Sequence, residues 1–306
     1  MRSASTRPRR IGFLYPGSPD REFDEWRPRF LDALKELGWV EGSNLFIEWR
    51  FAEYDQTVYA PLAADLVRAR VDALLGAGTP LTRALQQATR AVPIVTGVGD
   101  PVGSGFARNL AKPGGNITRL SWSLREKARK QIGLLLEMVP TVRTLLILRS
   151  PRYGDIAELN RCLKRVAHDC GTKAKVRTVE SFAEVEAALN RLAGLMTGAA
   201  FVYGHGSFQF DTSRLAETAI RHRVATVCDE RLAVEAGCLM SYALYHPDQT
   251  QRFASLIDQV LRGASPAETP FELPTKSEFV INRRTASSLG LAIAPQLLLR
   301  ADAVIS

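Results

Sequence analysis

Short apolar segments alternate with amphipathic segments along almost the whole chain. Residues 11–15 form the first apolar segment, and residues 25–37 follow with apolar side chains at helical spacing. The same succession of strand and helix continues through both halves of the sequence. Strands that alternate with helices form parallel β-α-β units, because each helix returns the chain to the same end of the sheet. The pattern therefore predicts an α/β protein with parallel sheets.

The alternation defines a full set of expected elements. Strands are expected over 11–15, 45–49, 71–75, 92–96, 144–148, 173–179, 199–203, 225–228 and 239–242. Helices are expected over 25–37, 59–70, 125–138, 156–170, 185–195, 214–222 and 247–261, with another that begins at about Leu81.

The chain length favours two lobes over one core. A length of 306 residues suits two lobes of about 150 residues each. The two halves also resemble each other, because Ser18-Pro19 and Ser150-Pro151 each follow a basic residue and an apolar strand. We therefore expect two doubly wound lobes, each with loops for a ligand at the carboxyl ends of its strands.

The net charge of +8 does not by itself identify a partner. Part of this charge comes from arginines within residues 1–10, which we expect to form a disordered basic tail. A second basic cluster, 119–130, falls on an expected helix, where a solvated face is the ordinary role. The sequence has no helix-turn-helix, zinc-finger or RNA-binding aromatic motif, so we expect no nucleic-acid partner.

The sequence carries no segment that would cross or enter a membrane. No apolar run approaches the roughly 18 to 20 residues that a membrane helix needs. Residues 11–15 are too short for the hydrophobic region of a signal peptide, and they lead directly into the expected fold. We expect either that an export signal has been removed or that the protein stays inside the cell.

Four cysteines occur, Cys162, Cys170, Cys228 and Cys238, and none belongs to a CxxC pair. A zinc or thioredoxin-type site is therefore not expected. Cys162 and Cys170 lie eight residues apart on one expected helix. A rise of 1.5 Å per residue separates them by about 12 Å, which is too far for a disulfide. We predict four free thiols without a metal, with Cys228 and Cys238 as the pair that adjacent strands bring closest.

Polar residues follow several strands of the first half. Ser18 and Thr79 stand where a helix N-cap belongs, and their hydroxyls and neighbouring amides suit a carboxylate or phosphate. Ordinary capping is the alternative role for both residues. Asp100 lies between Gly99 and Pro101 at a strand end, where it has little packing role and suits a ligand amine or hydroxyl.

The second half offers a matching set of candidates at its strand ends. They are Ser150, Tyr153, His205, Asp229 and Tyr242. His205 lies between two glycines, so a solvent-facing loop residue is its alternative role. We expect the candidates of both halves to bind one small ligand.

Enzymatic motifs are weak or absent. The glycines at 97, 99 and 103 depart from G-x-G-x-x-G because the third falls one residue late. The sequence has no Walker A motif, G-x-S-x-G elbow or H-E-x-x-H motif. We therefore expect no catalytic residues and no cofactor.

Several motifs together resemble one known family. They are Val40-Glu-Gly-Ser-Asn44, Ala63-Ala-Asp-Leu-Val67, Gly99-Asp-Pro-Val102, Lys112-Pro-Gly-Gly-Asn-Ile-Thr118, Gly237-Cys-Leu-Met-Ser-Tyr242, Pro274-Thr-Lys-Ser-Glu-Phe-Val-Ile-Asn282, Ala286-x-x-Leu-Gly-Leu291, Pro295-x-Leu-Leu298 and Arg300-Ala-Asp302. In this order they resemble the ABC-transporter substrate-binding family related to the tryptophan-binding TrpX-like proteins, which has a type I periplasmic-binding fold.

The resemblance implies two lobes joined by a hinge of three strands, near residue 120, Tyr242 and Pro274. The lobes would be 11–119 with 243–273, and 120–242 with 274–306. A ligand carboxylate is implied near Ser18 and Thr79, with Asp100 in the cleft between the lobes.

The chain also departs from the family pattern. Members often have Asn-Pro where this chain has Ser150-Pro151, and an acidic residue near the position of His205. These departures leave two ligand classes open, amino acids such as tryptophan or phenylalanine and other organic carboxylates.

The resemblance implies a solute-binding protein that captures a small organic ligand for the permease of an ABC importer. Closure of a hinge around the ligand is the implied mechanism, and the implied state is a monomer in the periplasm. A cytosolic sensor on the same fold is the alternative function. A two-lobed α/β enzyme is the least favoured one.

Overall fold

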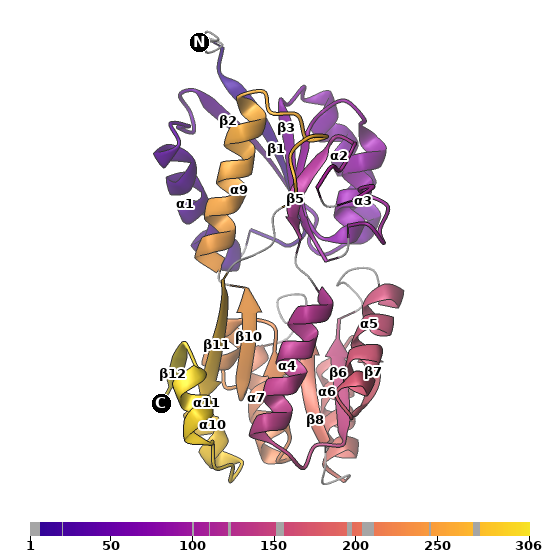
Figure 1. Cartoon of the computed structure of the whole chain (residues 1–306), viewed down its shortest axis with the longest axis vertical. Coiled ribbons are helices and arrows are strands. Elements are labelled where there is room, and N and C mark those ends of the chain that lie inside the picture. Colours follow the sequence, from indigo (N-terminus) through magenta and orange to yellow (C-terminus); the bar gives the residue numbers. More distant parts are fainter. Residues whose placement is uncertain are drawn as a thin grey trace. The chain divides into compact units, whose positions relative to one another are not determined.

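The protein was analysed as a computed structural model, which describes residues 7–19, 21–99, 101–109, 111–121, 124–150, 156–194, 198–203, 211–244, 246–271 and 276–306. The chain divides into two compact units. Unit 1 is Met1–Ser123 with His246–Thr275, and unit 2 is Leu124–Tyr245 with Lys276–Ser306 (Figure 1). The chain thus passes three times from one unit to the other, as the family resemblance implies.

Unit 1 contains a parallel five-stranded sheet of order β2-β1-β3-β4-β5 in its described residues. The strands are β1 Arg9–Tyr15, β2 Leu45–Phe51, β3 Ala73–Ala77, β4 Ile94–Val98 and β5 Ile117–Ser121. The helices are α1 Arg21–Glu36, η1 Gln56–Val58, α2 Tyr59–Arg68, α3 Thr79–Ala88 and α9 His246–Leu261.

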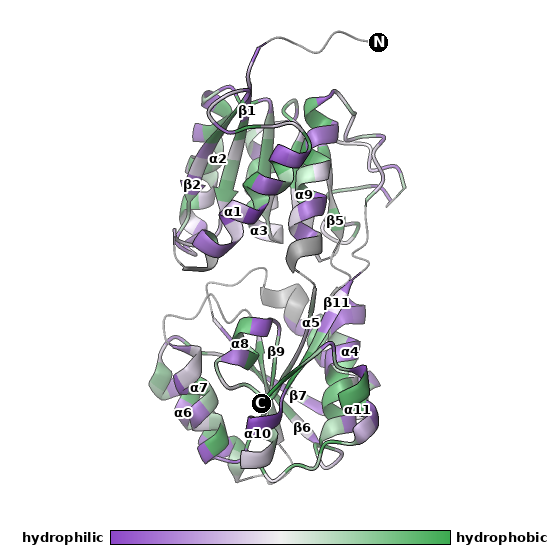
Figure 2. Ribbon diagram, turned by 90° about the vertical axis from the view of Figure 1, so that its left-hand side faces the viewer, coloured by the Kyte–Doolittle hydropathy of each residue, from purple (hydrophilic) through white to green (hydrophobic). Residues whose placement is uncertain are grey.

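The side chains of each strand alternate between two cores in unit 1. Ile11 and Phe13 of β1 pack with α1 and α9 on one face of the sheet. Leu14 packs with α2 and α3 on the other face. Figure 2 shows the result as mainly hydrophobic strands between helices that also carry hydrophilic residues. This alternation is the reason that both faces of the sheet need helices.

Unit 2 contains a seven-stranded sheet of order β12-β11-β10-β9-β8-β6-β7 in its described residues. The strands are β6 Thr144–Arg149, β7 Lys173–Thr178, β8 Gly198–Tyr203, β9 Ala225–Cys228, β10 Met240–Leu244, β11 Ser277–Asn282 and β12 Ala303–Ile305. The helices are α4 Leu124–Met138, α5 Ile156–Asp169, α6 Phe182–Ala193, α7 Thr212–Arg221, α8 Arg231–Glu235, α10 Arg283–Ser288 and α11 Pro295–Arg300. β11 is antiparallel to β10, while the other pairs are parallel.

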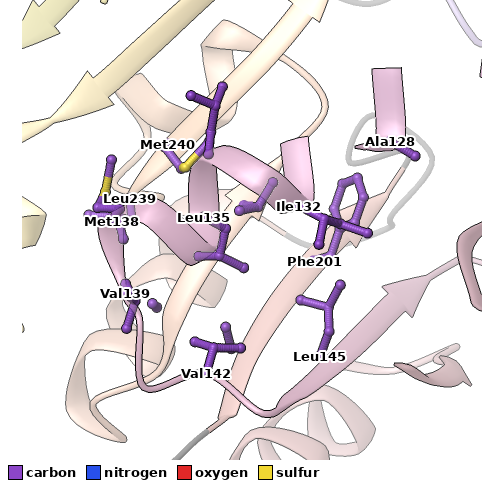
Figure 3. Packing of buried hydrophobic residues seen from close by; sticks show 14 of the residues in the cluster. Ala128, Ile132, Leu135, Met138, Val139, Val142, Leu145, Phe201, Leu239 and Met240 are labelled. Carbon is purple, nitrogen blue, oxygen red and sulfur yellow. The ribbon is translucent and has the colours of Figure 1, made fainter. Parts of the chain in front are cut away.

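Two cores also flank the sheet of unit 2. One core joins α4, α5, α10 and α11 to the sheet, and Figure 3 shows Ile132 and Leu135 of α4 close to Phe201 of β8 and Leu145 of β6. The other core joins α6, α7 and α8 to the opposite face. Two parallel-sheet α/β lobes, as expected from the sequence, are therefore confirmed.

Each sheet has a point at which the chain leaves two neighbouring strands in opposite directions along the sheet, with the following helices on opposite faces. In unit 1 this switch point lies between β1, which α1 follows, and β3, which α3 follows. In unit 2 it lies between β6, which α5 follows, and β8, which α7 follows. The loops diverge there and leave room beyond the carboxyl ends of the strands, which is where open α/β sheets bind ligands.

The structure corrects several boundaries expected from the sequence. The first lobe does not end at residue 119, because β5 continues to Ser121 in its sheet. Unit 1 resumes at His246 rather than at 243, because β10 extends through Leu244 in the other sheet. Arg9 and Arg10, expected in the basic tail, belong to β1.

The first residues of β1 are held by a carboxylate. Asp72 pairs with Arg7 and with Arg9, and it accepts the main-chain N–H of Arg10 at 2.9 Å. These contacts hold the arginines of residues 7–10 against the start of the sheet.

Candidate functional site

The switch point of unit 1 brings Ser18 and Thr79 to one edge of one sheet. Ser18 follows β1, and Thr79 follows β3, its direct neighbour. Neither residue is the N-cap that the sequence predicts. α1 begins only at Arg21, and the N-cap of α3 is Gly78, whose φ of 95° is the left-handed conformation that glycine tolerates. Thr79 is instead the first residue of α3, and its side chain is half-buried.

The start of α3 is fixed by main-chain hydrogen bonds. Gly78 donates to the carbonyl of Gly97 in β4 at 2.8 Å, and it accepts the N–H of Thr82 at 2.9 Å. The hydroxyls of Thr82 and Thr96 lie 2.5 Å apart in the buried interior. The first turn of α3 therefore has a fixed position at the end of β3, with the positive end of its dipole at the sheet edge.

The loop that carries Ser18 is held by the chain that follows β2. Glu53 donates its N–H to the carbonyl of Gly17 at 3.1 Å. Glu53 and Tyr54 have φ values of 50° and 59°, a conformation that side chains disfavour. A Cβ atom on Gly17 would lie 3.0 Å from the rings of Tyr15 and Tyr54. The approach of these two rings explains why glycine occupies position 17.

Aromatic residues lie at the carboxyl ends of the strands next to this loop. Tyr15 and Phe51 end β1 and β2, and both rings meet Phe23 of α1 at centroid distances of 5.2 and 4.9 Å. Tyr15 and Phe51 are only half-buried. This aromatic group was not predicted from the sequence, although the positions of both residues at strand ends carried the signal.

The described candidates of unit 2 belong to three different strands or to the residues that directly follow them. Ser150 follows β6 and is 3% exposed, and Asp229 follows β9 and is 5% exposed. β8 lies between these two strands. Tyr242 lies within β10, where its carbonyl accepts a hydrogen bond from the side chain of Gln131 at 2.8 Å and its ring packs partly against the core. Among the described candidates of unit 2, Ser150 is the one that adjoins the switch point.

Three candidates, Asp100, Tyr153 and His205, lie outside the described residues. Their roles stay predictions from the sequence.

A buried charge that was not predicted from the sequence lies at the switch point of unit 2. Arg149 is the last residue of β6 and has no exposed surface. Its Nη2 donates to the carbonyl of Ser150 at 3.3 Å, whereas Nε and Nη1 have no hydrogen-bond partner among the described residues. Burial lowers the pKa of the Arg149 guanidinium. An arginine at the end of a buried apolar strand was the signal in the sequence.

The described residues contain no group of three or more histidine, cysteine or acidic side chains that would hold a metal ion. Cys162, Cys170, Cys228 and Cys238 all lie outside a disulfide in the structure. Burial and a hydrogen bond with Cys238 raise the pKa of the Cys228 thiol. A raised pKa keeps this thiol protonated, which does not suit a nucleophile.

Within the described part of the chain, no helix is both long and apolar enough to cross a membrane.

Known proteins resemble this chain along most of its length. A tyrosine-binding protein from Clostridioides difficile is 25% identical over 277 residues, which cover 88% of this chain and 77% of that protein. A conserved domain protein from Vibrio cholerae superimposes with a TM-score of 0.85 at 24% identity, covering 97% of this chain and 100% of that one. An ABC domain from Streptococcus pneumoniae, solved in complex with L-tryptophan, gives a TM-score of 0.82 at 25% identity with the same coverage.

These solved structures have the same two-lobed parallel α/β fold. Residues 21–305 match the sequence family of ABC transporter substrate binding proteins. The match spans both units described above, so it concerns the whole fold rather than one motif. The chain therefore belongs to the ABC transporter substrate-binding protein family.

Proposed function

We propose that the protein binds a small organic carboxylate at the switch point of unit 1 and delivers it to the permease of an ABC importer. The observation that carries this proposal is the pairing of β1 with β3, which places Ser18 and Thr79 at one sheet edge. Hydroxyl groups and the free amides at the start of a helix are the donors that a carboxylate needs.

Aromatic side chains at the same edge favour a ligand with a flat apolar body. Tyr15 and Phe51 are half-buried and end the two strands at this side of the sheet. Offset or edge-to-face contact with a ligand ring suits such side chains. The names of two relatives, a tyrosine-binding protein and a domain solved with L-tryptophan, support an aromatic ligand.

Further ligand contacts are proposed from the sequence analysis. They are Asp100 in unit 1, and Ser150, Tyr153, His205 and Asp229 in unit 2. Tyr242 is placed at the border of the site, because its carbonyl already accepts the hydrogen bond from Gln131.

The same proposal has the protein bind its ligand without turnover or cofactor. It acts as a monomer outside the cytoplasmic membrane, in the periplasm, where the permease receives the ligand. Recovery of an added ligand unchanged after long incubation is the expected result, and formation of a product would favour an enzyme.

A thermal-shift screen against amino acids, aromatic acids and small carboxylates tests the function directly. At a hundredfold excess over its dissociation constant, a ligand stabilises the protein by about 2.7 kcal/mol. This stabilisation raises the melting temperature by on the order of 5 to 10 °C for a protein of this size. A screen in which no compound shifts the melting temperature counts against the function.

Two variants test the site once a ligand is known. Ser18→Ala and Thr79→Val each remove one hydroxyl, and we expect affinity in calorimetry to fall about tenfold for each. Ser43→Ala is the matched control, because Ser43 is exposed and precedes β2, at the opposite edge of the sheet. Equal affinities for all three variants and the unmodified protein would show that the ligand carboxylate binds elsewhere than at this switch point.

A further inference from the structure

Arg149 occupies the switch point of unit 2. It ends β6, and its neighbours in register are Thr178 on β7 and Tyr203 on β8. The helices that follow β6 and β8 pack on opposite faces of the sheet. Arg149 ends β6 in unit 2 as Tyr15 ends β1 in unit 1, and each of these strands borders the switch point of its sheet.

The direction of the Arg149 side chain follows from the alternation along β6. Leu145 and Ile147 face the core that α4 and α5 cover, while Leu146 and Leu148 face the opposite core. Arg149 is therefore on the face of α4 and α5, as is Tyr203 beside it. Its charge lies at the end of a mainly apolar core.

The guanidinium of Arg149 lacks a counter-charge among the described residues. Its Nη2 donates one long hydrogen bond, of 3.3 Å, to the carbonyl of Ser150. Nε and Nη1 have no hydrogen-bond partner among the described residues. Arg231 in the same unit shows the usual arrangement, because it pairs with Glu235 and Glu278. A buried charge without a partner is costly, and arginine does not lose its charge in proteins.

The helices that cover this face also have buried oxygens without partners. Gln131 on α4 uses its Nε2 for the carbonyl of Tyr242, but its Oε1 has no partner in the described part of the chain. The same holds for Oδ1 of Asn160 on α5. Buried polar groups in native proteins are normally satisfied. Gln131 and Asn160 thus add buried polar oxygens to the two helices that cover the face of Arg149.

We propose that Arg149 binds a second carboxylate of the ligand, so that the protein takes a dicarboxylate. This inference rests on the proposed function and adds the ligand class to it. A carboxylate matches the guanidinium in charge and in hydrogen-bond geometry. The ammonium group of an amino acid would instead be repelled by it. Since no part of Arg149 is exposed, the ligand has to uncover the guanidinium as it binds.

Calorimetry with matched pairs of acids tests the proposal. The probes are terephthalate against benzoate and adipate against hexanoate, together with L-tyrosine and L-tryptophan. We expect at least one dicarboxylate to bind about tenfold or more tightly than its partner acid, since a charge-assisted hydrogen bond is lost with the second carboxylate. Arg149→Met should abolish this preference, and Arg149→Lys should keep part of it.

The control for a lost positive charge is Arg143→Met. Arg143 is exposed and directly precedes β6, at the opposite end of the strand from Arg149. The preference for the dicarboxylate should survive this change. Without ligand, Arg149→Met should melt no lower than Arg143→Met, because it removes an unpaired buried charge.

Two results overturn the inference, and they are distinct from failure of the proposed function. Tighter binding of an amino acid or a monocarboxylate, unchanged in Arg149→Met, leaves the function standing and removes Arg149 from the site. A lower melting temperature of Arg149→Met with an unchanged preference makes Arg149 structural. If no dicarboxylate binds, the inference is wrong, and the wider ligand screen alone then decides the function.

Discussion

Tyr54 donates its main-chain N–H to the carbonyl of Pro16 at 2.6 Å, which ties the chain after β2 to the loop after β1. The next bond along, from Glu53 to Gly17, continues the same connection. Because the loop carries Ser18, the shape of the candidate carboxylate site depends on residues that are more than thirty positions away in the sequence.

Gly17→Ala tests this dependence. The new Cβ would lie 3.0 Å from the rings of Tyr15 and Tyr54, so one of the rings or the loop has to move. We expect a loss of about 1 to 3 kcal/mol in the free energy of unfolding. Gly115→Ala is the control, because a Cβ there meets no atom within 4 Å. Denaturant unfolding of both variants gives the comparison, and equal stabilities would contradict the tight contact.

Gly133→Ala should stabilise the protein. Gly133 lies inside α4, and a Cβ there meets no atom within 4 Å. Alanine favours a helix interior over glycine by about 1 kcal/mol. Gly38→Ala should do the reverse, since Gly38 has a φ of 91°. A lower melting temperature for Gly133→Ala would show that α4 does not tolerate a side chain at position 133.

The thiols should react in two classes. Cys228 and Cys238 are buried, whereas Cys162 and Cys170 are partly exposed. A thiol reagent added to the native protein should modify Cys162 and Cys170 first, and the unreduced protein should show all four thiols once unfolded. Two or fewer reactive thiols after unfolding would reveal a disulfide, with Cys228 and Cys238 as the nearest pair.

The free energy of unfolding should depend on pH in the alkaline range because of Tyr59. Burial, with the charge of Asp55 as a smaller cause, raises the pKa of Tyr59 from 10.0 to about 12. The unfolded chain loses the phenolic proton first, so stability should fall as the pH rises above 10. The loss attributable to Tyr59 is on the order of 2 kcal/mol by pH 12. Tyr59→Phe should show a shallower fall in urea unfolding between these pH values, and an unchanged slope would assign the effect to other groups.

Asp100→Asn should weaken ligand binding while leaving the fold intact. Asp100 precedes Pro101, which has no N–H for the carboxylate to accept. Loss of a charge-assisted hydrogen bond to the ligand costs roughly 1.5 to 3 kcal/mol, or about tenfold or more in affinity. The melting temperature without ligand should stay the same or rise. A large drop in that temperature at unchanged affinity would make Asp100 a structural residue.

The sequence predicts the repeating strands and helices well because their apolar spacing is strong. β1 and β6 are continuous apolar runs, and both were expected. β5 was missed because Arg119 interrupts its pattern, and β12 because it has only three residues. Pairing with a neighbouring strand, which a single sequence does not display, completes both of them.

The location of the candidate site could be predicted from the sequence, whereas the roles of its residues could be predicted only in part. Ser18 and Thr79 were expected from their positions after strands, and the strand order brings them together. Their expected capping role was wrong because Gly78 is the N-cap of α3 and α1 begins only at Arg21. Arg149 was missed because an arginine after an apolar run looks like an ordinary surface residue until its burial is known.

The last helix of unit 1 has a consequence for how the protein is made. α9 supplies Phe253, Leu256 and Ile257 to the core against α1, and its Asp258 accepts a hydrogen bond from Trp39 at 2.8 Å. When synthesis has passed Ser123, the sheet of unit 1 therefore has one face half covered, and α9 is complete only 138 residues later. During that interval the apolar side chains that α9 covers face solvent, so a gene fragment that ends after β5 should yield an aggregating product.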